Sequence, residues 1–277
     1  MSLFRPLPPG HWLLPVLLLL PVAQGSAHPA VETRISRLDQ LVQAHPQEQA
    51  LYIQRGALYA RHGQWQPALD DLALAETLGE PQEVGFEQGR LRYRQQKYTL
   101  AREAFSRYLT LHPGHPEALL YRARAARAEG DTDAALADFL RHFAAADRPH
   151  PGDLIAAARL LETQGDSGRA RAIALLDGGL DRLGMQPQLQ RHAIGLELQR
   201  DNVAAALRRC RELETVLGQS PRWQLEMAQL LLRSEHRDEA ALLLERARAQ
   251  LDDLRPTPAR RELRVEIERL QTSGLEG

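Results

Sequence analysis

Small apolar, large apolar and polar residues follow one another along this chain in a pattern that recurs every 33 to 36 residues. The clearest marker is an alanine near the start of an amphipathic segment, and successive copies are 33, 34, 35, 36 and 34 residues apart. A period in this range is typical of stacked helical hairpins. The six copies are Ala68, Ala101, Ala135, Ala170, Ala206 and Ala240.

Two further columns accompany these alanines. A small residue precedes the alanine by twelve positions in five units, and a large residue follows it by four positions in most units. Small residues facing each other allow two antiparallel helices to approach closely, and the large residue fills the space beside them. The small column is Gly56, Gly89, Ala123, Ala158 and Ala228, with Ile194 in the fifth unit; the large column is Leu72, Phe105, Phe139 and Leu244, with Ala174 and Cys210 in the fourth and fifth.

Glycine and proline mark the limits of these helices. Gly63, Gly130 and Gly165 fall between the two helices of a unit, where a glycine suits a helix C-terminus. Prolines such as Pro81 and Pro151 fall between units, where they end one helix or begin the next. The pattern predicts an all-α chain of six helix pairs over residues 49–81, 82–115, 116–150, 151–186, 187–220 and 221–256.

Both ends of the array have segments suited to cover it. Val31, Ile35 and Leu38 are spaced for one apolar helix face, which predicts a capping helix within residues 28–48. At the other end, Thr257 can cap a helix whose apolar face includes Ile267, which predicts a second capping helix and tail over 257–277. Terminal helices with a polar outer face keep a stacked array soluble.

The first 27 residues have a different character. Arg5 precedes an apolar stretch from Leu13 to Val22, and Gly25-Ser26-Ala27 supplies small residues at a cleavage site. This pattern is typical of a secretory signal peptide and predicts cleavage after Ala27. The stretch is short for a transmembrane helix, although an uncleaved anchor remains the alternative. We therefore expect a periplasmic or secreted protein without a membrane span after cleavage.

The repeats resemble the tetratricopeptide repeat family. Gly56, Tyr59, Ala68 and Pro81 carry the resemblance in the first unit, and the second and third units are similarly close. The last three units depart from the pattern, and the register of the fifth is open by one residue. The resemblance covers residues 49–254, most of the expected mature chain, and implies a right-handed superhelical solenoid of antiparallel helix pairs. It also implies a concave groove that binds peptides or protein segments.

The same resemblance places particular positions of each first helix in that groove. These positions combine apolar residues with a ladder of arginines. Arginine pairs bidentately with carboxylates and is always charged, so we expect the groove to bind an acidic or C-terminal carboxylate segment of another envelope protein. The alternative is that these arginines are simply solvated. The implied groove residues are Arg61, Phe86, Arg90, Tyr93, Arg94, Arg124, Arg127 and Arg159.

Composition, charge and missing motifs argue against nucleic-acid binding and against enzymatic activity. The formal net charge is −1, which gives no field favouring nucleic acid. No nucleophile–base pair, phosphate loop or zinc-helix motif is present, so we expect no enzyme and no cofactor. A polysaccharide-binding module is the alternative function, for which Phe86 and Tyr93 would supply stacking rings. Asp70 and Asp71 are adjacent in a predicted helix and are interpreted as solvated.

Histidine and cysteine give no metal or thiol site. His112 and His115 flank a loop without a third ligand, so we expect no metal there. His28 would become the N-terminus after cleavage and could chelate copper with its amino group, a minor alternative. Cys210 occupies an apolar repeat position and is interpreted as a small core residue.

Overall fold

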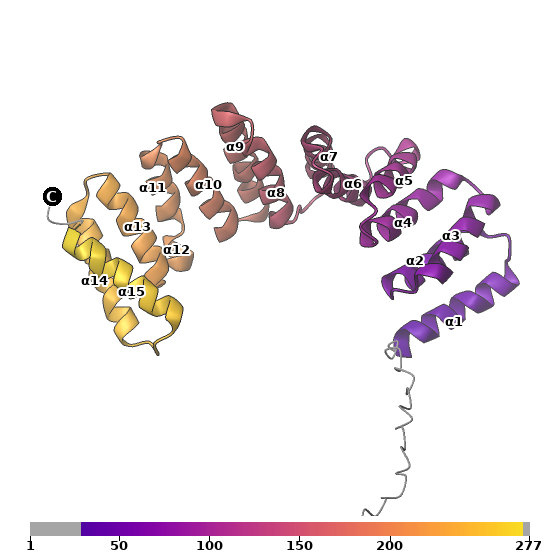
Figure 1. Cartoon of the computed structure of the whole chain (residues 1–277), viewed down its shortest axis with the longest axis horizontal. Helices are drawn as coiled ribbons and strands as arrows, with labels where there is room; N and C mark the ends of the chain where they lie inside the picture. Colours follow the sequence, from indigo (N-terminus) through magenta and orange to yellow (C-terminus); the bar gives the residue numbers. More distant parts are fainter. Residues whose placement is uncertain (1–28, 274–277) are drawn as a thin grey trace, which may run out of the picture.

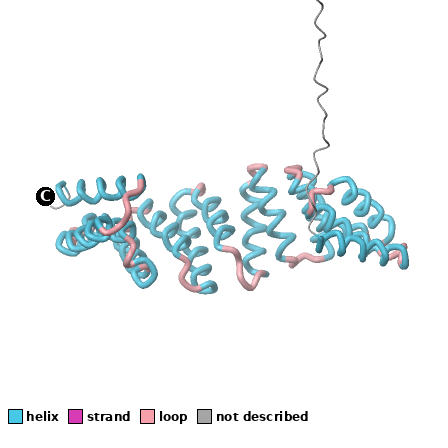
Figure 2. The backbone as a smooth tube through the Cα atoms, turned by 90° about the horizontal axis from the view of Figure 1, so that it is seen from below, coloured by secondary structure: helices cyan, strands magenta, loops and turns pink. Residues whose placement is uncertain are grey.

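The computed structural model describes residues 29–273, and these residues form helices joined by short loops, without a strand (Figure 1, Figure 2). The predicted signal peptide, its cleavage site and His28 lie outside the described residues. The helices are α1 (Pro29–Ala44), α2 (Gln49–Arg61), α3 (Trp65–Leu78), α4 (Pro81–Arg94), α5 (Tyr98–Leu111), α6 (Pro116–Ala128), α7 (Thr132–Ala145), α8 (Pro151–Glu162), α9 (Gly165–Leu183), α10 (Pro187–Gln199), α11 (Val203–Glu212), α12 (Glu214–Leu217), α13 (Pro221–Arg233), α14 (Arg237–Asp252) and α15 (Pro258–Ser273).

Consecutive helices pack as pairs, which confirms the predicted all-α solenoid. The pairs are α2/α3, α4/α5, α6/α7, α8/α9, α10/α11 and α13/α14, and each also contacts the next pair. They follow one another along an open arch, with α1 at one end and α15 at the other (Figure 1). Each pair therefore shares its core only with its neighbours, as in other repeat arrays.

The turn inside every pair contains one residue in the left-handed conformation. This residue is the fifteenth of its repeat unit, and its φ is 73° at Gly63, 81° at Gly130 and 78° at Gly165. Glycine adopts this conformation without steric penalty. The other three pairs use residues with a side chain at the same place, which carry strain that glycine would avoid. These residues are Gln96, Asp201 and Glu235.

The small columns bring the two helices of a pair into contact. Ala68, Ala101, Ala135, Ala206 and Ala240 are all fully buried. A Cβ built at Gly89 would lie 2.6 Å from the Phe105 ring, so only glycine fits there. Ala158 and Ala228 are fully buried in the same column as Ala123 and Gly89. The close approach inferred from the sequence thus has a direct steric cause.

Two positions depart from the expected columns. Ala170 is only half-buried, and Ala172 is fully buried instead. In the other five pairs a residue with ψ between 64° and 81° separates the left-handed residue from the second helix, whereas α9 begins directly at the left-handed Gly165 and its phase is shifted. In α10 the buried small residue is Ala193, one position before Ile194.

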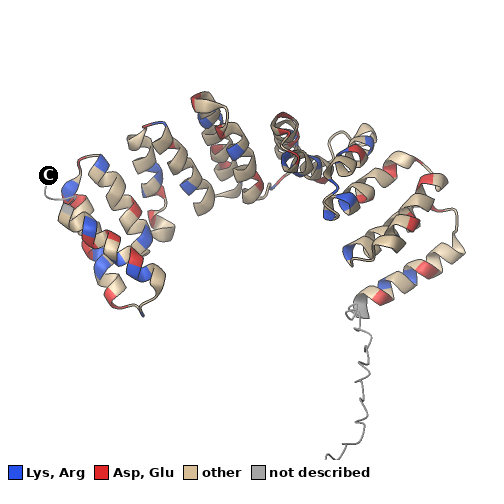
Figure 3. Ribbon diagram, viewed as in Figure 1, with Lys and Arg blue, Asp and Glu red and all other residues tan. Residues whose placement is uncertain are grey.

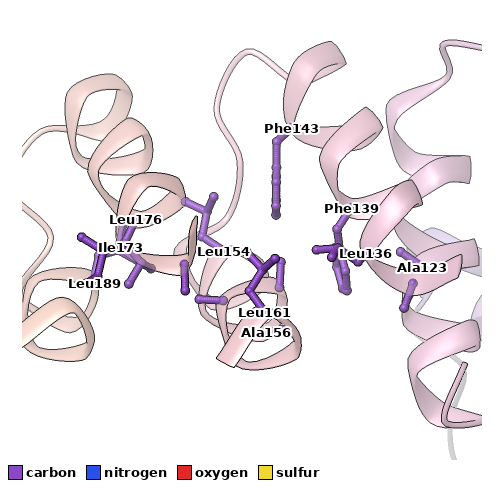
Figure 4. Close-up of a cluster of buried hydrophobic side chains, with 14 of the residues drawn as sticks. Ala123, Leu136, Phe139, Phe143, Leu154, Ala156, Leu161, Ile173, Leu176 and Leu189 are labelled. Atoms are coloured by element: carbon purple, nitrogen blue, oxygen red, sulfur yellow. The ribbon is translucent and has the colours of Figure 1, made fainter. Parts of the chain in front are cut away.

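Four hydrophobic clusters follow one another along the arch. The largest spans α6 to α10 and includes Phe139, Leu154 and Leu176 (Figure 4). The guanidinium of Arg182, in α9, donates hydrogen bonds to the carbonyl of Phe143 in α7 (2.7 Å) and to the carbonyl of Asp147 in the loop between α7 and α8 (3.0 Å). The loop between α7 and α8 is therefore fastened to the following pair.

The first and third helix pairs each contain a buried ion pair between an arginine and an aspartate sixteen residues further along the chain. Arg55 bonds both carboxylate oxygens of Asp71 at 2.8 and 2.7 Å. Asp71 is buried, so the interpretation of it as a solvated residue is wrong; Asp70 is exposed. Arg55 also bonds Asp39 of α1 at 2.8 Å, which fastens α1 onto the first pair.

The third pair repeats this arrangement. Arg122 bonds Asp138 at 2.6 and 2.7 Å and reaches back to the Ser106 hydroxyl of α5 at 3.1 Å. In both pairs an arginine of the first helix thus joins the second helix of its own pair to the helix before it. α1 therefore contacts α2 as α5 contacts α6.

Candidate functional site

A hollow lies where α1, α2 and α4 meet, and we call it the N-terminal cradle. Its volume is about 510 Å³. Four arginines surround an apolar floor, and one carboxylate, Glu87, is present among them. The lining residues are Arg34, Arg37, Leu38, Leu41, Gln54, Ala57, Leu58, Arg61, Glu87 and Arg90. The sequence analysis placed Arg61 and Arg90 here but did not identify the two arginines of α1.

Most of the positive charge of the cradle is uncompensated. Arg34, Arg37 and Arg61 are exposed, and within residues 29–273 none of them forms an ion pair. Arg90 is paired with Glu87 at 3.0 Å. The cradle therefore presents three cations that have no carboxylate partner in the described part of the chain.

Glu87 and Arg90 are the most buried charged residues of the cradle. Burial raises the pKa of the Glu87 carboxyl, although the nearby guanidinium groups of Arg90, Arg61 and Arg94 oppose this shift. The Arg90 guanidinium lies over the Phe86 ring at 5.5 Å from its centroid, and its Nε is buried without a hydrogen-bond partner in the described structure. This guanidinium is held in place and retains an unused donor.

The remaining arginines of the predicted ladder have different roles. Arg124 bonds both carboxylate oxygens of Asp153 at 2.9 Å, which joins α6 to α8. Arg94 donates to the Ala60 carbonyl at 2.9 Å and joins α4 to α2. Arg127 and Arg159 are exposed, and no ion pair to either exists among residues 29–273. The ladder is thus partly structural.

The two predicted groove aromatics pack against other rings. Phe86 lies 5.3 Å from Tyr108 and 4.9 Å from His115, measured between centroids. Tyr93 makes edge contacts with Tyr98 and Tyr121, both at 5.5 Å. Both rings are half-buried. They stabilise the second and third pairs and offer little free surface for stacking a sugar.

A larger hollow lies at the opposite end of the arch, between α10, α13 and α15. Its volume is about 670 Å³, and we call it the C-terminal hollow. Ile194, Gly195 and Leu198 of α10 form one wall. The sequence analysis missed this hollow because it aligned Ile194 with the buried small column. The opposite side is formed by Gln229, Leu232 and Arg233 of α13 and by Glu266, Arg269 and Leu270 of α15.

Histidine and cysteine have packing roles here. No group of three or more histidine, cysteine, aspartate or glutamate side chains within residues 29–273 is arranged to hold a metal ion. His112 lies 2.9 Å from Glu83, and His115 accepts a hydrogen bond from the Ala118 amide at the start of α6. Cys210 is buried, and burial raises the pKa of its thiol to about 12, which keeps it protonated and unreactive.

Comparison with known proteins agrees with this architecture. The profile of the tetratricopeptide repeat family matches residues 86–151. Comparison with curated protein sequences gives no significant match. A solved tetratricopeptide-repeat protein from Cytophaga hutchinsonii has a TM-score of 0.64 at 10% identity, over 84% of this chain and 94% of that chain.

Two other solved structures are similar. YrrB, described as a tetratricopeptide-repeat protein with an unusual peptide-binding site, gives a TM-score of 0.56 at 12% identity, over 73% of this chain and 99% of its own. MamA gives a TM-score of 0.51 at 12% identity, over 64% of this chain and 98% of its own. At these identities the likeness is one of fold.

The search for membrane spans gives a simple result for the described residues: none of their helices combines the length and apolar character needed to cross a bilayer. The family profile and the shared architecture both indicate tetratricopeptide-like repeats. The tetratricopeptide repeat profile matches residues 86–151, and the helices that the structure describes share the fold of solved tetratricopeptide-repeat proteins.

Proposed function

We propose that this protein is a non-enzymatic adaptor of the bacterial periplasm that binds an acidic or carboxylate-ended segment of an envelope protein in its N-terminal cradle. The fold is one that serves protein–protein interaction. The observation that carries the proposal is the set of three unpaired arginines, Arg34, Arg37 and Arg61, beside an apolar floor. Arginine forks are suited to carboxylates, and the floor suits the apolar parts of the same segment.

Charge elsewhere on the arch supports the choice of this face. Lysine and arginine alternate with aspartate and glutamate along the helices, so most surfaces are mixed (Figure 3). Many arginines are used in ion pairs between helices, as Arg124 is with Asp153. The cradle differs because its arginines outnumber its carboxylate.

The binding test compares two triple variants of equal charge. Arg34→Gln, Arg37→Gln and Arg61→Gln together remove the unpaired arginines of the cradle. Arg237→Gln, Arg248→Gln and Arg261→Gln remove three exposed arginines from α14 and α15 and serve as the matched control. A fluorescein-labelled decapeptide with four aspartates and glutamates is titrated with each protein, and fluorescence anisotropy gives the Kd.

Exposed ion pairs contribute about 0.2–1 kcal/mol each. Three such contacts total about 0.6–3 kcal/mol and therefore predict a loss of affinity of about 3- to 150-fold in the cradle variant. Little change is expected in the control. Equal losses in both would contradict the proposal, because net charge alone would then explain binding. Arg124 is left intact, since changing it would break the pair with Asp153.

The periplasmic location is proposed from residues 1–27 and has its own test. Export with cleavage after Ala27 gives a mature protein that begins at His28. Cell fractionation followed by N-terminal sequencing of the native protein measures both. Recovery of the uncleaved chain in the cytoplasmic fraction would contradict this part of the proposal without affecting the cradle.

A further inference from the structure

We infer that the C-terminal hollow is a second binding site, which takes a bulky apolar side chain of a protein segment with a carboxylate close to that side chain. The hollow lies between α10, α13 and α15, at the opposite end of the arch from the cradle (Figure 1). Its volume of about 670 Å³ lies within the range of small-ligand pockets, about 300–1,000 Å³.

The walls of the hollow are apolar and accessible. Ile194, Leu198, Leu232 and Leu270 line it, and all four are half-buried rather than fully covered. Ile194 lines the hollow because Ala193, one residue earlier, occupies the buried position of α10. A leucine or phenylalanine side chain entering the hollow would remove both its own surface and these walls from water, which is the main source of affinity.

Gly195 keeps the hollow open and has no packing reason to be glycine. A Cβ built there meets no atom within 4 Å, whereas a Cβ at Gly85 would lie 2.6 Å from the Ala104 carbonyl oxygen. Glycine inside a helix is less stable than alanine, so a glycine that packing does not require suggests another role. Any larger side chain at Gly195 would extend into the hollow.

The charges at the rim indicate the rest of the ligand. Arg191 is paired with Glu226 at 3.3 Å, and Arg269 with Glu266 at 3.0 Å. Arg233 is exposed and forms no ion pair within the described residues. One cation is therefore left over beside the apolar walls, and a single carboxylate complements it.

A protein segment fits this rim better than a hydrocarbon acid does. The side-chain amide of Gln229 lines the hollow together with the two rim ion pairs. A hydrocarbon chain would cover these polar groups without giving them hydrogen-bond partners, which is unfavourable. The amides and carbonyls of a peptide backbone provide such partners. The ligand is therefore an apolar side chain carried by a peptide and next to an acidic residue.

The test compares two glycine substitutions. Gly195→Leu fills the hollow, and Gly178→Leu in α9 is the matched control, because a Cβ at Gly178 also meets no atom within 4 Å and this residue lies outside the hollow. A displayed library of random heptapeptides is selected on the wild-type protein. The enriched peptides are then synthesised, and their Kd values for each variant are measured by anisotropy.

We expect the enriched peptides to combine leucine, isoleucine, phenylalanine or tryptophan with a nearby aspartate or glutamate. Gly195→Leu should weaken them at least 10-fold, and Gly178→Leu less than 2-fold. Arg233→Gln should weaken acidic peptides but not their glutamine or asparagine counterparts. Both leucine variants are expected to melt no lower than wild type. If Gly195→Leu melts lower, Leu198→Gln replaces it with the same expectation.

The inference fails if selection enriches no such peptide, or if the filled hollow binds as well as the open one. It also fails if octanoate binds in a manner that Gly195→Leu abolishes while no peptide does. The inference does not depend on the adaptor proposal, because the cradle variant Arg34→Gln, Arg37→Gln and Arg61→Gln leaves the hollow intact. Loss of hollow binding and loss of cradle binding are thus separate results.

Discussion

The ion pair between Arg122 and Asp138 tests how the array is held together. Asp138→Ala removes a carboxylate whose side chain is 8% exposed and leaves Arg122, 20% exposed, without its bidentate partner. Removing one member of a buried pair costs about 3–5 kcal/mol, and an exposed pair contributes about 0.2–1 kcal/mol. Because Arg122 keeps some solvent contact and its bond to Ser106, we expect a loss of about 2–3 kcal/mol in the free energy of unfolding.

The double variant separates the pair from the packing. Arg122→Met with Asp138→Leu replaces both charges by apolar groups of similar size, and such replacements are often neutral or stabilising. The double variant should therefore be more stable than Asp138→Leu alone, with a coupling free energy of about 2 kcal/mol in the cycle formed by Arg122→Met, Asp138→Leu and the two together. Asp133→Ala, which removes an exposed carboxylate of the same helix, is the control and should cost less than about 1 kcal/mol.

Urea unfolding followed by circular dichroism gives these free energies. Amide hydrogen exchange shows where stability is lost, because repeat arrays can unfold in parts. We expect the amides of α6 and α7 to lose protection before those of α13 and α14. The reasoning is refuted if Asp138→Ala costs less than about 0.5 kcal/mol and the coupling is zero, since the pair would then add nothing beyond a surface contact.

Three further predictions concern single positions. Gln96→Gly should raise the free energy of unfolding by about 0.5–1 kcal/mol, because the left-handed backbone with φ of 59° no longer strains a side chain; a lower urea midpoint would contradict this. Gly89→Ala should lower it by about 1–3 kcal/mol, since the new Cβ overlaps the Phe105 ring, and an unchanged melting temperature would show that the ring can move. Glu87→Gln should gain stability relative to wild type as pH rises above the ordinary range of a glutamate. The raised pKa of Glu87 means that the folded protein holds this proton more tightly than the unfolded chain does, so wild type loses stability when the carboxyl ionises. Parallel curves of unfolding free energy against pH for the two proteins would contradict this assignment.

The sequence predicted the repeated architecture because its cause is local. Alanine and glycine columns specify which faces can approach, and Gly89 against Phe105 shows this on an atomic scale. Errors arose where helix phase changed without a sequence marker. Ala170 lies in the expected sequence context, yet α9 begins two residues early relative to α7 and buries Ala172 instead.

The site was harder to predict, because an arginine's role depends on its distant neighbours. Arg90 and Arg124 stand in the same column, but Arg124 meets Asp153 from the next pair and becomes structural. Arg34 and Arg37 lie in a capping helix that carries no repeat pattern, so no column pointed to them. The C-terminal hollow depended on a shift of one residue in α10, which the sequence left open.

Net charge therefore says little about what this protein binds. A formal charge of −1 on a chain with 35 basic residues describes a surface of mixed sign, and much of that charge is used to join helices. Arg55 and Arg122 contribute to the fold and are unavailable to a partner, because each is committed to a buried aspartate. A partner meets only the cations left over, and Arg34, Arg37 and Arg61 at the cradle and Arg233 at the C-terminal hollow are among them. The charge that is not compensated within the fold, rather than the total, is what should determine specificity.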